Sequence, residues 1–123
     1  MRTIRFEARE LPANSEHYPA SRLRDGEVYF RVSFCDQDLL IPQLEPLVFI
    51  GRDLGVDDTD IGFLYFQDVR SYSNGTRFGT PSDDEPMFER FLESQSSGVF
   101  DYENALNALL RCSLRRRAKG TAE

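Results

Sequence analysis

The chain has 123 residues, of which 40% are hydrophobic and 29% charged, with a formal net charge of −6 at pH 7. This balance is typical of a globular protein, and the length is that of one ordinary domain, so we expect residues 1–123 to form a single domain with residues 118–123 as a flexible tail. No run approaches the roughly 18 apolar residues of a membrane span, and residues 1–10 lack the apolar segment of a secretory signal. We therefore expect a cytoplasmic protein that contacts no membrane.

The charge is unevenly distributed. Residues 1–110 hold 10 arginines and 20 acidic residues, whereas residues 111–123 hold five basic residues and one acidic residue. An acidic body repels polyanions, while a basic end can attract them.

Residues 3–9 alternate between apolar and charged side chains, with Ile4, Phe6 and Ala8 on one side. This spacing predicts an amphipathic strand whose charged side protects a sheet edge. Residues 11–26 are rich in turn-forming residues and predict a loop that is long enough to contain a short helical turn.

The stretch 28–35 predicts the central strand. Val28, Phe30, Val32 and Phe34 alternate with more polar residues, so that one face is apolar. A hairpin partner is expected at residues 39–41, with Pro42 and Pro46 interrupting regular pairing before an apolar strand at residues 47–50.

The next apolar stretch, residues 61–69, predicts a strand buried on both faces. Asn74-Gly75 then predicts a hairpin turn with a short return strand at residues 76–78, because this dipeptide tolerates the positive φ angles of a tight turn. Residues 86–96 predict a short helix, with Met87, Phe88, Phe91 and Leu92 forming its apolar side.

Residues 102–117 predict the longest helix, with Asp101 as its N-cap and arginines at its C-terminal end. Its leucine stripe, Leu106, Leu109 and Leu110, is expected to cover the apolar face of the central strand. Strands followed by helices predict an α+β fold: a largely antiparallel sheet, or a small partly open barrel, of about five strands, with one short helix and a C-terminal helix packed on one face.

The sequence shows no Gly-rich phosphate loop, no paired-cysteine metal spacing and no Gly-x-Ser-x-Gly turn. A Cys35–His17 nucleophile pair would require the loop to fold back onto the central strand, and both Cys35 and Cys112 are expected as reduced, buried thiols. Asp53, Asp57, Asp58 and Asp60 lack the spacing of a calcium loop, and we interpret them as solvated turn residues. We predict no catalytic residues, no metal and no cofactor.

These features favour a non-catalytic domain that acts through protein contacts, as a homo-oligomer and with a further protein partner. The alternative is binding of RNA or single-stranded nucleic acid, with aromatic side chains stacking on bases and arginines contacting phosphates. The residues that would do so are Tyr29, Tyr65, Tyr72, Arg115, Arg116 and Arg117.

Overall fold

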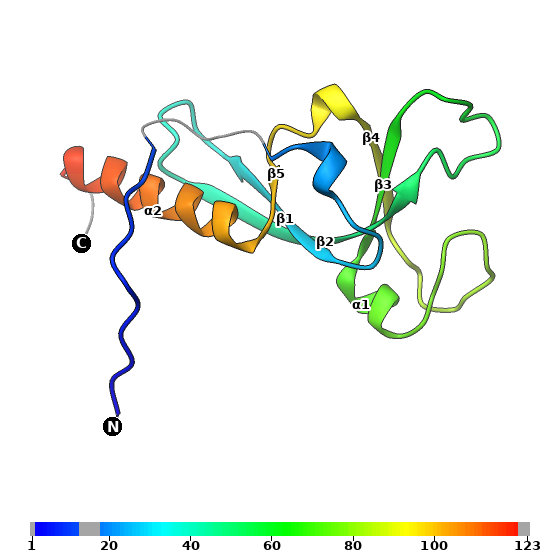
Figure 1. Ribbon diagram of the computed structural model, residues 1–123, viewed down its shortest axis with the longest axis horizontal. Coiled ribbons are helices and arrows are strands. Elements are labelled where there is room, and N and C mark those ends of the chain that lie inside the picture. The colour runs from blue at the N-terminus through cyan, green and yellow to red at the C-terminus, as the bar shows by residue number, and fades with distance from the viewer. Residues whose placement is uncertain (1, 13–17, 121–123) are drawn as a thin grey trace.

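The computed structural model describes residues 2–12 and 18–120 (Figure 1). Five strands form one antiparallel sheet in the order β4-β3-β2-β1-β5. They are β1 (Val28–Phe34), β2 (Pro42–Arg52), β3 (Phe63–Asp68), β4 (Phe88–Leu92) and β5 (Val99–Phe100). The helical elements are the 3-10 turns η1 (Ala20–Arg22) and η2 (Glu93–Gln95), the short helix α1 (Val69–Ser73) and the long helix α2 (Tyr102–Ala118). The α+β prediction is confirmed, in its open-sheet form.

The sheet buries both of its faces. On the first face, which we call the curled face, Tyr29, Leu47, Phe49, Leu64 and Phe66 pack with Ala20 and Leu23 from the η1 segment. Arg31 of β1 reaches an ion pair with Glu89 of β4 at 3.1 Å although β2 and β3 lie between these strands, so the sheet curls around this face.

The opposite face, the α2 face, carries Phe30, Val32 and Phe34, because alternate side chains of a strand point to opposite sides. These residues pack with Phe100 of β5 and with α2. The strand predicted at residues 28–35 is thus confirmed as β1, but the middle strand of the sheet is β2, and each face of β1 contributes to a core.

Pro42 and Pro46 lie within β2, paired with Phe34 and Phe30, and the predicted interruption is wrong. The Phe49 N–H donates to the Glu27 carbonyl at 3.0 Å, on the side of β2 that faces β1. Backbone N–H groups alternate in direction along a strand, so those of the even-numbered residues of β2 point to its other edge. The pairing of β3 with β2 runs from Leu47 to Arg52 and stops short of both prolines. Their missing N–H groups therefore fall on an unpaired edge, where proline is tolerated.

The predicted hairpin at Asn74-Gly75 is also wrong, because this dipeptide ends α1. Asn74 is the C-cap, and Gly75 follows with φ +94°. A helix C-terminus and a tight hairpin both use a residue with positive φ, so the same dipeptide is typical of either. The expected return strand does not form; instead, Phe78 packs edge-on against Tyr65 and Phe88.

The helix predicted over residues 86–96 is replaced by β4 and η2. All five residues of β4 pair with β3, from Phe88 opposite Gln67 to Leu92 opposite Phe63. A short apolar run fits either period, and an isolated helix of this length is marginal in water. The open edge of β3 decides in favour of the strand, because pairing there satisfies a row of backbone groups.

The Asp68 carboxylate joins β3, α1 and β4. It accepts hydrogen bonds from the Ser71 N–H at 2.9 Å, the Ser71 hydroxyl at 2.6 Å and the Met87 N–H at 2.8 Å. Desolvation acts to raise its pKa, but these three donors outweigh it, and the pKa of Asp68 lies below its ordinary value.

We expect Asp68→Ala to cost about 0.5–2 kcal/mol at pH 7, as for other N-cap residues. A lowered pKa in the folded state stabilises above the unfolded value of about 3.9, and this stabilisation disappears as the pH falls through the folded-state pKa. The difference between wild type and variant should therefore shrink from about pH 4 downward. Urea unfolding from pH 7 to pH 2 measures it, and a pH-independent difference would contradict this role.

Candidate interaction surface

Helix α2 begins as predicted, with Asp101 Oδ1 accepting the Asn104 N–H at 2.9 Å. The side that it turns to the sheet is not the predicted one. Ala105, Ala108 and Cys112 are the apolar residues buried on this side, at i, i+3 and i+7, and the two alanines pack with Val32 and Phe100. The prediction that the leucines form the main cover is therefore wrong.

An apolar stripe consequently runs along α2 beside its buried side. It consists of residues spaced four apart, which share one side of a helix: Tyr102, Leu106, Leu110 and Leu114. Leu106 is half-buried, whereas Tyr102 is 64%, Leu110 38% and Leu114 52% exposed. We call these four residues the α2 stripe.

A shallow groove of about 110 Å³ runs between this stripe and the sheet. Its walls are formed by Phe30, Leu44, Tyr102, Ala105, Leu106 and Leu109. Leu44, on β2 between the two prolines, is 47% exposed. Apart from the Tyr102 hydroxyl the lining side chains are apolar, so the groove is suited to packing rather than to chemistry.

Residues 2–12 form an extended segment next to α2. The predicted strand at residues 3–9 is wrong, since no residue of this segment pairs with the sheet. Arg9 attaches the segment to α2 through Glu103 Oε1 and Asn107 Oδ1, each at 2.7 Å. We call residues 3–8, which precede this attachment, the arm; in Figure 1 it runs away from the body.

Two of the predicted phosphate-binding arginines hold the β1–β2 connection. Arg115 donates to the Leu39 carbonyl at 3.0 Å, and Arg116 donates to the Leu40 carbonyl at 2.9 Å. Arg115 also lies over the Phe34 ring, while Arg117 is exposed. Positive charge is thus concentrated at the C-terminal end of α2, where some N–H donors of Arg115 and Arg116 already bond to backbone carbonyls.

The three predicted base-stacking tyrosines are not brought together. Tyr29 and Tyr65 are buried on opposite faces of the sheet, 4% and 5% exposed. The Tyr29 hydroxyl accepts the Arg24 N–H at 2.9 Å, and Tyr72 is half-buried beneath Arg77. Binding of nucleic acid stays a prediction.

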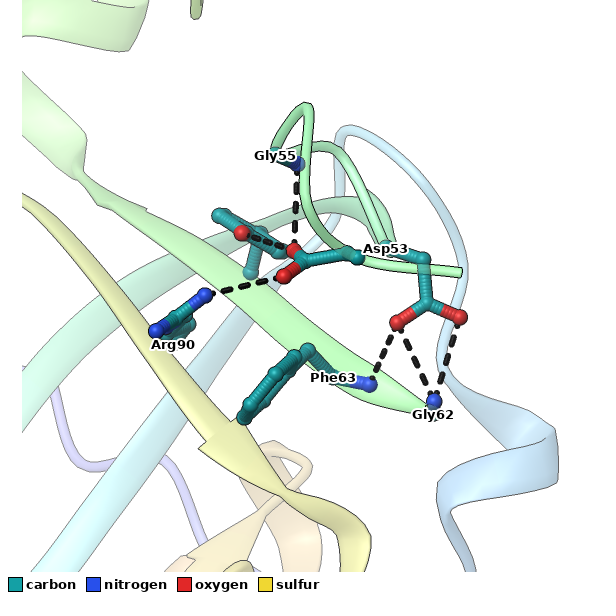
Figure 2. Close-up of polar contacts among 7 residues, drawn as sticks. Asp53, Gly55, Gly62, Phe63 and Arg90 are labelled. Carbon is teal, nitrogen blue, oxygen red and sulfur yellow. Dashed lines mark hydrogen bonds and ion pairs between the residues drawn. The ribbon is translucent and has the colours of Figure 1, made fainter. Parts of the chain in front are cut away.

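The acidic loop between β2 and β3 is tied to the sheet (Figure 2). Asp53 accepts hydrogen bonds from the N–H groups of Gly62 and Phe63. Asp58, whose side chain is 2% exposed, accepts the Tyr65 hydroxyl, the Gly55 N–H at 3.1 Å and an Arg90 ion pair at 2.9 Å. The interpretation as solvated turn residues is therefore wrong for Asp58, which anchors the loop.

Within residues 2–12 and 18–120, no three His, Cys, Asp or Glu side chains are grouped as metal ligands. Cys112 is buried and contacts the Leu39 carbonyl, but Cys35 is exposed, which corrects the expectation of two buried thiols. His17 lies outside the described residues, and so does part of the predicted tail, since α2 extends to Ala118 and the description ends at residue 120.

Comparison with family models, curated proteins and solved structures finds no match. Among the described residues, none of the helices has the length and apolar character needed to cross a membrane. Within the described residues, the groove, the α2 stripe and the arm are the surfaces that suggest a function.

Proposed function

We propose that this protein is a non-catalytic domain that acts through protein contacts and self-associates through the groove and the α2 stripe. The observation that carries the proposal is the orientation of α2, which places small residues against the sheet and leaves larger ones half-exposed. Burying one leucine side chain contributes roughly 1.5–3 kcal/mol, so a partner that covers this surface gains stability that the single chain lacks.

The composition of the surface supports the same proposal. Interface centres are enriched in aromatic side chains and depleted of charge. Here Tyr102, Phe30 and Leu44 meet in the groove, while the charged pair Arg9–Glu103 lies outside it. An apolar centre with a polar rim is the usual arrangement of a specific interface.

Sedimentation velocity across the micromolar range tests the proposal. We expect wild-type protein to form a dimer with rising concentration, and Leu110→Asp to remain monomeric, because the new carboxylate would be desolvated in the interface. Val56→Asp is the matched control, since Val56 is 99% exposed in the loop between β2 and β3.

Thermal melts of both variants establish that they remain folded. A wild-type protein that stays monomeric throughout would overturn the proposal. Equal loss of association in the Leu110 and Val56 variants would overturn the assignment to α2.

A further inference from the structure

The most unusual feature of the molecule is the exposure of the arm. Ile4 is 87% and Phe6 92% exposed, although both are large apolar side chains. They alternate with Arg5 and Glu7, so in an extended chain both point to the same side, about 7 Å apart. One side of the arm is therefore apolar, and the described part of the chain does not cover it.

The base of the arm is fixed next to the groove. Arg9 bonds to Glu103 and Asn107, which lie one helical turn apart on α2. Leu106, in the groove wall, follows Glu103 by three residues and therefore neighbours it on the surface of the helix. The arm therefore starts on α2 beside the α2 stripe. In Figure 1 it runs away from the body.

The chain does not favour a return of the arm into its own groove. A return would require a reversal within residues 3–10, and this stretch, Thr-Ile-Arg-Phe-Glu-Ala-Arg-Glu, contains no Gly, Pro, Asn, Asp or Ser. These are the residues that make tight turns. The β-branched and aromatic residues Ile4 and Phe6 instead favour an extended conformation.

We infer that two copies of this chain exchange their arms, so that Phe6 of each copy enters the groove of the other and Ile4 lies on the adjoining α2 stripe. The inference rests on the proposed self-association and names its contact. A groove of about 110 Å³ is of the right order for one phenyl ring, because a cavity of about 150 Å³ holds benzene. A two-fold axis uses both arms and both grooves in one closed dimer.

The contact uses side chains rather than strand pairing. The edge of β2 next to Leu44 lacks two N–H groups because of Pro42 and Pro46. An arm laid along this edge would therefore form an incomplete ladder. The affinity therefore comes from the side chains of Phe6 and Ile4, while Arg5 and Glu7 point to solvent.

Disulfide trapping tests the exchange in the full chain, in a Cys35→Ser background that removes the exposed thiol. A tagged Phe6→Cys chain is mixed with an untagged Leu106→Cys chain under mild oxidation. We expect a disulfide product with the mass of one tagged and one untagged chain. The matched control replaces Leu106→Cys by Val56→Cys and should give little of this product; Leu44→Cys serves as a second groove position if Leu106→Cys does not fold.

Sedimentation of Phe6→Asp completes the test, and the expected result is loss of the dimer. At concentrations where wild type is monomeric, the thermal melt of the variant should equal that of wild type. A dimer that survives Phe6→Asp but dissociates in Leu110→Asp would overturn arm exchange and leave self-association standing. A monomer-mass disulfide in the Phe6→Cys/Leu106→Cys double variant would place the arm in its own groove, which also overturns exchange. Monomeric wild-type protein at every concentration would overturn both proposals.

Discussion

Phe66→Ala is expected to lower the free energy of unfolding by about 3–5 kcal/mol, the usual cost of truncating a buried aromatic residue. Phe66 is completely buried, with its ring centroid 5.4 Å from that of Phe49 and 5.2 Å from that of Phe91. These rings come from β2, β3 and β4, so the cavity would open where three strands meet. Because domains of this size are stable by about 5–15 kcal/mol, the loss is a large share of the total.

Urea unfolding measures this loss as a lower midpoint at an unchanged slope. Phe78→Ala is the control, because Phe78 is 39% exposed and its truncation removes less buried area. If the two variants lost equal stability, the curled face would not be the principal core.

Asp58→Ala is expected to have the second-largest effect, about 2–3 kcal/mol, because it leaves the buried Tyr65 hydroxyl and the Gly55 N–H without an acceptor. The half-exposed Arg90 guanidinium can return to water, which limits the cost below that of a fully buried ion pair. The packing around this carboxylate is close: a Cβ on Gly55 would lie 2.7 Å from the Tyr65 hydroxyl and 2.9 Å from Asp58 Oδ2.

A double-mutant cycle with Tyr65→Phe separates the hydroxyl from the rest of the network. Asp58→Ala combined with Tyr65→Phe should cost less than the sum of the two single changes, because each single change removes the same hydrogen bond. The neighbouring exposed residue supplies the control, Asp57→Ala, which should stay within about 0.5 kcal/mol of wild type. Additive losses would show that Asp58 and Tyr65 act independently.

Local sequence patterns were sufficient where one period was unambiguous. The alternation from Val28 to Phe34 predicted β1, and the N-cap at Asp101 with the helical spacing after it predicted α2. In both cases side-chain spacing and backbone preference favour the same structure, and the contacts with neighbouring elements are consistent with it.

Patterns compatible with two structures were resolved only by tertiary contacts. The apolar residues of Phe88–Leu92 fit a helix or a strand, and the open edge of β3 selected the strand. The alternation of Ile4, Phe6 and Ala8 predicts a strand, but none of the strands within residues 18–120 pairs with it. A strand requires a partner for its backbone groups, and its own sequence does not specify one.

Residue spacing and the Asp101 cap are enough to predict α2, its first residue and the residues that share a side. Which side lies on the sheet depends on contacts with the other elements. Ala105 and Ala108 face Val32 and Phe100, while Leu110 and Leu114 remain partly exposed, by 38% and 52%. The apolar spacing favours the leucines as the buried side because they are the most hydrophobic residues of the helix. In the structure, the rings on the sheet are already bulky, and small side chains on the helix allow it to pack against them at the usual density of a protein interior.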